Sequence, residues 1–230
     1  MTERELLQAG LDTLGLNRPQ AVDKLLAFSD CLLETNKVMN LTAVTDPMEV
    51  VTRHFLDCAP LAPYAAGKTV IDVGCGAGFP GVPLALLTDA QVTLLDALGK
   101  RIKFLNGVID QLGIDNAHAV HARAEEFDGR EQFDLATSRA VARLNVLAEL
   151  SLPLVKVGGY FIAMKAVGSD EEIEQAKKAF SILGGSLERV VDYDVPMTDD
   201  RKSRLVIVRK VRPTPGKYPR RFQKISAQPL

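Results

Sequence analysis

The sequence predicts an α/β protein: a mostly parallel, doubly wound sheet that closes in an antiparallel hairpin and follows a helical N-terminal extension. From Lys68 onward short apolar runs alternate with amphipathic stretches, as strands and helices do in such sheets. A short turn near residues 198–202 separates the last two runs, and strands joined so tightly pair antiparallel because parallel strands need a long crossover. With 230 residues, 47% of them hydrophobic, the chain can bury a large core.

The N-terminal part of the chain reads as helical. Leucines recur at helical spacing in two stripes, and the second stripe begins after Pro19. Residues 36–46 are polar enough for a loop, and a helix restarts at Pro47. We therefore expect a helical cap over residues 1–60 and a second domain over residues 61–230, which ends in a basic tail.

The alternating part of the chain predicts seven strands and four further helices. The strands are expected near residues 69–73, 91–95, 118–121, 133–137, 159–164, 187–193 and 204–210. The helices are expected near residues 81–88, 100–112, 142–151 and 170–182. In an open α/β sheet a ligand lies outside the carboxyl ends of the strands, so the residues at those ends are the candidates for a site.

An acid and three alternating glycines follow the first expected strand: Asp72, Gly74, Gly76 and Gly78. Glycine takes positive φ and lets the backbone approach a ligand, while the N-terminus of the next helix attracts an anion. Residues 76–81 also match the G-x-G-x-x-G dinucleotide fingerprint, with Asp96 at the expected distance of about twenty residues. Asp72 favours another ligand, because an acid at this place suits a cationic group better than a pyrophosphate.

The frame D-x-G-x-G-x-G resembles the first motif of class I S-adenosylmethionine-dependent methyltransferases, whose Rossmann-like sheet also ends in an antiparallel hairpin. The resemblance implies that Asp72 faces the methionine ammonium of the cofactor and that Asp96 holds the ribose hydroxyls. It also implies that Ala124 and Glu125, after the third strand, contact the adenine. A dinucleotide ligand, a ligand-free glycine turn and a solvated helix start at Ala124 remain the alternatives.

Residues 201–230 are strongly basic. They hold ten Lys and Arg and no acid, whereas the other 200 residues hold 18 bases and 29 acids, a net charge of −11. A basic end on an acidic body predicts a nucleic-acid contact. A solvated terminal strand and tail is the alternative that charge alone leaves open.

The fourth expected strand ends in Ser138, Arg139, Ala140 and Val141. The chain lacks the Asn/Asp-Pro-Pro-aromatic motif that enzymes methylating exocyclic amines commonly carry here, and it lacks the cysteine nucleophile that pyrimidine carbons require. The target is therefore expected to be an atom that is already nucleophilic at neutral pH and needs no strong base. Position seven of guanine fits, because its lone pair lies in the ring plane. We accordingly expect no catalytic acid, base or nucleophile.

Several motifs together resemble one family, the bacterial small-subunit rRNA guanine-7 methyltransferases, also called the glucose-inhibited division protein B family. They are NLTAV at 40–44, RHFLD at 53–57, the glycine loop at 72–83, RAE at 123–125, SRAV at 138–141 and YPRR at 218–221. The resemblance implies that Gly74, Phe79, Ala124, Glu125 and Arg139 hold S-adenosylmethionine. It also implies methyl transfer to one guanine of 16S rRNA, free or in the small ribosomal subunit.

The expected contacts with RNA are basic or lie near the strand ends: Arg53, His54, Lys165, Arg220 and Arg221. His54 and Asp57 lie three residues apart, which suits a catalytic pair or, more commonly, a histidine packed against the sheet. Phe79 is expected against the cofactor or the target base, with core packing as the alternative. The tail departs from the family by having fewer lysines after Arg221.

Other function classes receive no support from the sequence. The chain has no charged-then-apolar leader, no apolar run near the roughly twenty residues of a membrane span, and three cysteines without C-x-x-C spacing. We expect a cytoplasmic monomer without a metal or a membrane partner. A methyltransferase acting on a small molecule or protein, and a non-enzymatic nucleotide-binding module, are the rival functions.

Overall fold

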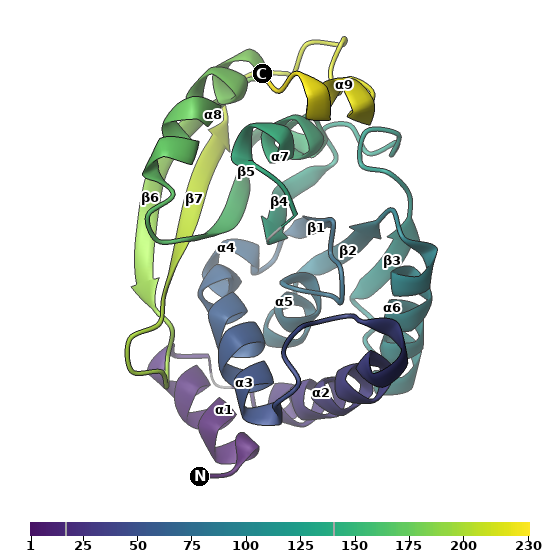
Figure 1. Ribbon diagram of the computed structural model, residues 1–230, viewed down its shortest axis with the longest axis vertical. Coiled ribbons are helices and arrows are strands. Elements are labelled where there is room, and N and C mark those ends of the chain that lie inside the picture. Colours follow the sequence, from purple (N-terminus) through teal and green to yellow (C-terminus); the bar gives the residue numbers. More distant parts are fainter. Residues whose placement is uncertain (17, 140) are drawn as a thin grey trace.

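The computed structural model describes residues 1–16, 18–139 and 141–230, and its centre is a seven-stranded sheet of order β3-β2-β1-β4-β5-β7-β6 (Figure 1). The strands are β1 (Thr69–Val73), β2 (Gln91–Asp96), β3 (Ala117–His121), β4 (Phe133–Arg139), β5 (Val155–Ala166), β6 (Gly185–Asp194) and β7 (Lys202–Lys210). The first five strands are parallel, and β7 lies antiparallel between β5 and β6. The predicted fold class is confirmed.

The helices follow the predicted order with additions at both ends of the chain. They are α1 (Glu3–Thr13), α2 (Pro19–Met39), α3 (Pro47–Val50), α4 (Ala62–Ala65), α5 (Gly81–Leu87), α6 (Gly99–Leu112), α7 (Leu144–Ser151), α8 (Asp170–Ile182) and α9 (Phe222–Ala227). A π-helical turn (Val51–Leu56) continues α3, and single 3₁₀ turns lie at Ala59–Leu61 and Leu152–Leu154.

Local sequence explains where these elements differ from expectation. Helix α2 runs into the expected loop as far as Met39, and Asn40 ends it in the left-handed region at φ +49°. Strand β5 begins at Val155, four residues before the expected start. The expected start was too late because Gly158 and Gly159 interrupt the apolar pattern of this strand. Helix α9 carries no long periodic pattern and was not predicted.

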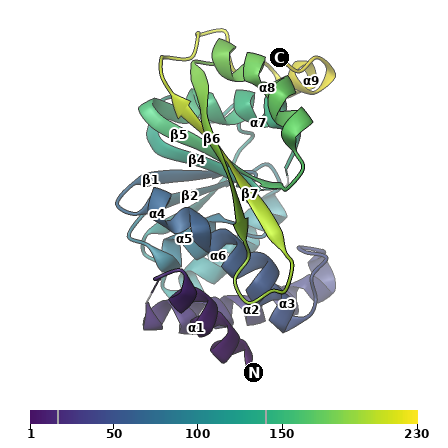
Figure 2. The same ribbon diagram turned by 90° about the vertical axis from the view of Figure 1, so that its left-hand side faces the viewer.

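Hydrophobic side chains pack on both faces of the sheet. One cluster joins α1, α2, α5 and α6 to alternate residues of the strands, such as Val70 and Val92. The other cluster joins α7, α8 and the C-terminal segment to the intervening strand residues, such as Ile71 and Phe161, which face the opposite side of the sheet. Figures 1 and 2 show the resulting three layers, with the sheet between two sets of helices.

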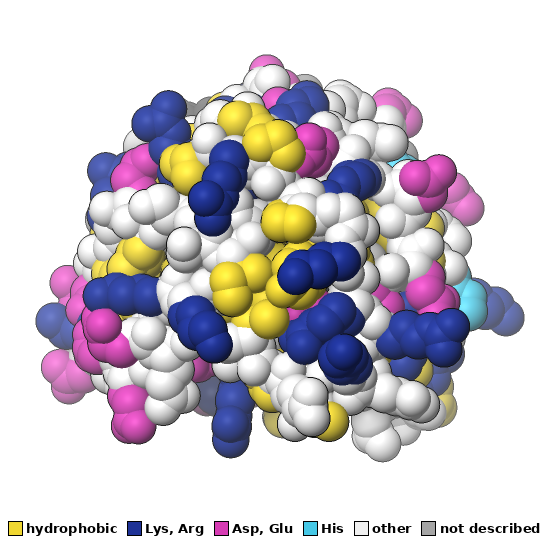
Figure 3. Space-filling model, turned by 90° about the horizontal axis from the view of Figure 1, so that it is seen from above, with side chains coloured by type: hydrophobic (Ala, Val, Ile, Leu, Met, Phe, Trp, Pro, Cys, Tyr) yellow, Lys and Arg dark blue, Asp and Glu magenta, His cyan; other side chains and the backbone are white. Residues whose placement is uncertain are grey.

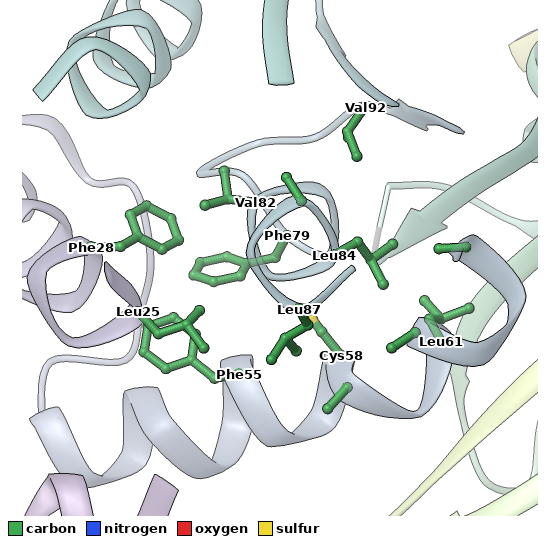
Figure 4. Packing of buried hydrophobic residues seen from close by; sticks show 14 of the residues in the cluster. Leu25, Phe28, Phe55, Cys58, Leu61, Phe79, Val82, Leu84, Leu87 and Val92 are labelled. Carbon is green, nitrogen blue, oxygen red and sulfur yellow. The ribbon is translucent and has the colours of Figure 1, made fainter. Parts of the chain in front are cut away.

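The N-terminal helices hold the glycine loop through an aromatic cluster. Phe28 of α2, Phe55 of the π-helical turn and Phe79 pack against one another, with ring centroids 5.4 Å (Phe28–Phe79), 6.1 Å (Phe55–Phe79) and 5.9 Å (Phe28–Phe55) apart (Figure 4). Phe28 and Phe55 are fully buried, and Phe79 is 5% exposed. The cap predicted over residues 1–60 therefore shares a core with the sheet domain, and the division at residue 60 stays a prediction.

The β6–β7 hairpin extends beyond the sheet toward the N-terminal helices (Figure 2). The Tyr193 hydroxyl donates a hydrogen bond to the Asp57 carbonyl at 2.9 Å, and Arg189 donates one to the Tyr64 hydroxyl at 3.0 Å. The hairpin thus fixes the segment that carries His54 and Asp57. No helix in the described parts of the chain is both long and apolar enough to cross a membrane.

Candidate cofactor and substrate site

A pocket of about 470 Å³ lies at the carboxyl ends of the central parallel strands, a size within the roughly 300–1,000 Å³ of small-molecule sites. The structure brings most of the predicted cofactor residues to its wall: Gly74, Gly76, Phe79, Asp96, Ala124, Glu125 and Arg139. Asp72 and Gly78 do not line it. The place of the site follows from the fold, because parallel strands direct their carboxyl ends to one edge.

The glycine loop forms the floor of this pocket. Gly74 has φ +72°, and a Cβ atom there would lie 2.7 Å from the nearest methyl carbon of Val141. The Gly74 and Cys75 amides donate to the Leu95 carbonyl at 2.8 and 3.0 Å, so the loop is fixed to the end of β2. The backbone itself is therefore exposed to a ligand, and a side chain at Gly74 is excluded both by space and by φ.

Asp72 supports the loop from beneath. Its side chain is fully buried, one carboxylate oxygen accepts a hydrogen bond from the Gly81 amide at 2.8 Å, and the other has no partner within the described residues. Burial raises the pKa of Asp72 to about 7, against the lowering effect of that hydrogen bond. Asp72 thus reaches the loop from the sheet side, and its contact with a cofactor ammonium stays a prediction.

Asp96 organises the pocket edge after β2. Its carboxylate accepts hydrogen bonds from the Gly76 amide at 2.9 Å and the Leu98 amide at 2.8 Å, and Arg101 lies 3.2 Å away. Arg101 was not predicted as a site residue, although it follows Asp96 by about one helical turn. The acid therefore ties the glycine loop to the start of α6.

The outer wall of the pocket contains Ala124 and Glu125, the predicted adenine contacts. Arg123 forms an ion pair with Glu125 at 3.2 Å, and its guanidinium lies 5.4 Å from the centre of the Phe222 ring. Phe222, from the C-terminal helix α9, also lines the pocket. No periodic or charge pattern in the sequence pointed to Phe222.

Arg139, His54 and Phe79 form a stack at the inner end of the pocket. The Arg139 guanidinium lies 5.0 Å from the centre of the Phe79 ring, and the His54 ring stacks on Phe79 at 4.4 Å. Arg139 donates to the Arg53 carbonyl and to His54 Nδ1, both at 3.0 Å, and lies 3.5 Å from the Asp57 carboxylate. The π-helical turn directs the Arg53 carbonyl toward Arg139.

His54 is a neutral part of this stack. Burial, and after it the charge of Arg139, lowers the pKa of His54 to about 3. Nδ1 of His54 lies 3.0 Å from the Arg139 guanidinium and 3.1 Å from the Arg53 carbonyl, and Nε2 lies 2.9 Å from the Thr42 hydroxyl, so both ring nitrogens have polar partners. His54 and Asp57 therefore meet through Arg139, in an arrangement that orients the guanidinium.

A second cleft, of about 380 Å³, shares His54 and Arg139 with the first. Its lining is rich in basic residues: Arg53, Arg139, Lys165, Arg201 and Lys202. Lys165 is partly engaged, since it donates to the Ala142 carbonyl and to Glu172. The Nε atoms of Arg53 and Arg201 are buried without a partner in the described part of the chain. Basic side chains thus lie beside the Arg139 stack in this cleft.

The two predicted RNA contacts in the tail, Arg220 and Arg221, differ in their burial and in their partners. Arg220 donates to the fully buried carboxylate of Glu149 at 2.7 and 2.6 Å, so its charge is neutralised inside the protein. Arg221 is exposed. Neither lines the two clefts. Ala140, in the motif with Arg139, lies outside the described residues.

No group of three or more His, Cys, Asp or Glu side chains suited to hold a metal ion occurs among the residues that the structure describes. Cys58 and Cys75 are buried, and burial raises the pKa of the Cys58 thiol to about 12. The site therefore consists of backbone, aromatic and charged groups.

The sheet order and the glycine loop define the class I S-adenosylmethionine-dependent methyltransferase fold. A similar solved structure is TYW2 from P. horikoshii in complex with MeSAdo, with a TM-score of 0.55 and 19% identity over 66% of this chain and 60% of that chain. Another is TYW2 from M. jannaschii in complex with AdoMet, with a TM-score of 0.54 and 15% identity over 66% and 72%. At these identities the likeness shows the fold.

Sequence comparison identifies the family. The family model GidB, described as rRNA small subunit methyltransferase G, matches residues 21–201. Curated relatives with the name ribosomal RNA small subunit methyltransferase G include those of Acetivibrio thermocellus, 46% identical over 99% of this chain and 96% of the relative, and Clostridium perfringens, 43% identical over 98% of each. The chain belongs to this family, which confirms the resemblance stated from its motifs.

Proposed function

We propose that the protein transfers the methyl group of S-adenosylmethionine to the ring nitrogen at position seven of one guanine in 16S rRNA. The observation that carries the proposal is that two clefts share Arg139 and His54, in a chain of the rRNA small subunit methyltransferase G family. One cleft has the glycine loop of a methyltransferase, and the other is basic. Cofactor and RNA can therefore approach Arg139 and His54 from two directions.

The cofactor is S-adenosylmethionine, and the residues of the first cleft fit it. The backbone at Gly74 and Gly76 lines the cleft and suits its methionine portion, and at Gly74 a Cβ atom would collide with Val141. Asp96 suits the ribose, and Ala124 with Glu125 suits the adenine. When bound, the cofactor supplies a methyl group on a positively charged sulfur.

The protein residues act mainly by positioning. Arg139 presents its planar guanidinium where the two clefts join, stacked over the buried Phe79 ring, and such a planar face suits a base. Nitrogen seven of guanine is nucleophilic without deprotonation, so no general base is required, and neutral His54 serves by orienting Arg139. Holding donor and acceptor in line and excluding water then supplies most of the rate enhancement.

The second cleft suits the RNA side of the reaction. Arg53, Lys165 and Arg201 offer donors for phosphate or base edges, and such contacts make binding dependent on salt. We assign Arg220 the role of anchoring the tail through Glu149, and Arg221 remains the proposed RNA contact there. We also propose that the protein is a cytoplasmic monomer that acts on 16S rRNA.

Methyl transfer from labelled S-adenosylmethionine tests this function. The purified protein is incubated with 16S rRNA, with small ribosomal subunits, or with protein and metabolite extracts. The expected result is label in RNA alone, released as 7-methylguanosine after nuclease digestion, with Gly74→Val as an inactive control. Label in another atom of the base, or in protein or a metabolite instead of RNA, contradicts the proposal.

A further inference from the structure

The C-terminal segment, residues 213–230, folds back over the sheet and places an aromatic ring in the cofactor pocket. Helix α9 begins at Phe222, and the Phe222 ring lines the first cleft together with Leu150 of α7. This ring is 37% exposed, whereas Ile225, one turn later, is fully buried. Phe222 is therefore directed toward the pocket by a helix whose other face is buried.

The segment is fixed to the protein at several points before it reaches the pocket. Glu149, with no exposure, accepts hydrogen bonds from the backbone amide and the guanidinium of Arg220. Arg130 donates to the Tyr218 carbonyl at 2.8 Å and also to the Thr214 carbonyl. Lys210, also fully buried, donates to the Thr214 hydroxyl at 2.8 Å. Removing one partner of such a buried charged pair is strongly destabilising, so these contacts hold the segment firmly in place.

Phe222 lies beside the residues expected to bind adenine. Arg123 connects the two places, since its guanidinium lies over the Phe222 ring while its Nε pairs with Glu125. Ala124, between them in the chain, lines the same wall. A partly exposed phenyl ring with a planar cation beside it offers the face on which a purine stacks.

Figure 3 shows the end of the molecule that carries α7, α8 and α9. Lys and Arg side chains surround a central group of hydrophobic side chains on this face. Three partly exposed apolar residues line the cofactor pocket: Leu98, Val141 and Phe222. They give the pocket an apolar rim, and such a rim suits a nucleobase better than a phosphate.

We propose that the C-terminal segment is a wall of the cofactor site and that Phe222 packs against the adenine of S-adenosylmethionine. This role differs from the RNA contact that the basic composition of the tail predicts. It rests on the proposed function for the identity of the cofactor and is independent of the methylated RNA. Arg220 and Lys210 then serve to hold the wall in place.

Calorimetric titration of the RNA-free protein tests the proposal with Phe222→Ala, Phe222→Trp and Val211→Ala. Val211, at 52% exposure, is the matched control because it lines a different groove. Phe222→Ala should weaken S-adenosylmethionine binding about tenfold, the usual effect of losing one stacked base. Affinity for 5′-methylthioadenosine, which keeps the adenosine portion, should fall by the same factor, while Phe222→Trp and Val211→Ala bind normally.

RNA affinity measured on the same variants separates this role from an RNA contact. Phe222→Ala should bind 16S rRNA as tightly as the original chain. Unchanged affinity of Phe222→Ala for both adenosine ligands, or a loss of RNA affinity alone, overturns the proposal. If the original chain itself does not bind S-adenosylmethionine, the proposed function fails instead, so the two failures are distinguishable.

Discussion

The glycine loop and the basic C-terminal tail carry the clearest patterns in the sequence, but the loop lies where its pattern predicts, whereas part of the basic charge of the tail is paired inside the protein. Hydrogen bonds from the Gly74 amide to the Leu95 carbonyl and from the Gly76 amide to Asp96 hold the loop, and both glycines line the pocket as expected. In the tail, Arg220 and Lys210 have partners inside the protein. A glycine pattern predicts the position of a site well, because few other structural roles require glycines at this spacing. A positively charged side chain can pair either with RNA or with a buried acid, so its charge alone does not predict its partner.

The largest effect is expected at the loop. Gly74→Val places a branched side chain against Val141 in a backbone at φ +72°, so affinity for S-adenosylmethionine should fall at least about 100-fold, or about 2.7 kcal/mol. Calorimetry measures it. Gly107→Val, at an exposed glycine of α6 with open space around it, is the control. Normal binding by the Gly74 variant would remove the loop from the cofactor site.

Arg139 tests whether one side chain joins the two clefts. Arg139→Ala removes the stack on Phe79 and leaves Asp57 without its cation, so kcat/KM should fall at least about 100-fold. The free energy of unfolding should also fall, by about 3 kcal/mol. Arg4→Ala is the matched control, because its pair with Asp23 is exposed and contributes at most about 1 kcal/mol. Equal kinetics for both variants would refute a central role for Arg139.

Arg220 tests whether the charges of the C-terminal tail are paired inside the protein. Arg220→Ala leaves the buried Glu149 carboxylate uncompensated, so the free energy of unfolding in urea should fall by about 3 kcal/mol. Adding Glu149→Leu should restore part of the loss. Arg221→Ala, at the exposed neighbour, should leave stability unchanged and weaken RNA binding at low salt. Equal changes in stability and in RNA affinity for the Arg220 and Arg221 variants would contradict the assignment of Arg220 to the protein interior and Arg221 to RNA.

The fold was predictable to the order of strands and helices, since hydrophobic periodicity follows directly from which face of each element is buried. The pocket wall was largely predictable too, because strand ends and glycines are visible in the sequence. Phe222, Arg123 and Glu149 were not, since their roles depend on how a tail without periodicity folds back on the sheet. The position of Asp72 beneath the loop likewise depends on side-chain burial, which motif spacing does not specify.

His54 gives a smaller, pH-dependent effect that separates neutral from cationic roles. Its folded pKa, about 3, lies below the unfolded value near 6.5, so the unfolded state takes up the proton first and stability falls as pH decreases below 6.5. Between pH 7.5 and 5 this costs about 2 kcal/mol. Comparing His54→Gln with the original chain over that range isolates the effect, since Asp72 titrates in both. Parallel stability curves would mean that His54 is charged in the folded state.

The smallest effect is expected at the cysteines. Burial holds the pKa of the Cys58 thiol near 12, so Cys58 is a poor nucleophile, and direct transfer to guanine requires none. Replacing Cys31, Cys58 and Cys75 by Ala or Ser should lower stability while kcat changes less than about threefold. Metal chelators should also leave kcat unchanged. Loss of turnover with intact cofactor affinity in the Cys58 or Cys75 variant would point to a covalent mechanism.

Mapping 7-methylguanine in 16S rRNA from cells with and without this gene tests the proposed function most directly. One guanine should lose its methyl group when the gene is deleted, and regain it when the original chain is supplied but not when Gly74→Val is supplied. Identical methylation patterns with and without the gene would contradict guanine-7 methylation of 16S rRNA as the function of this protein.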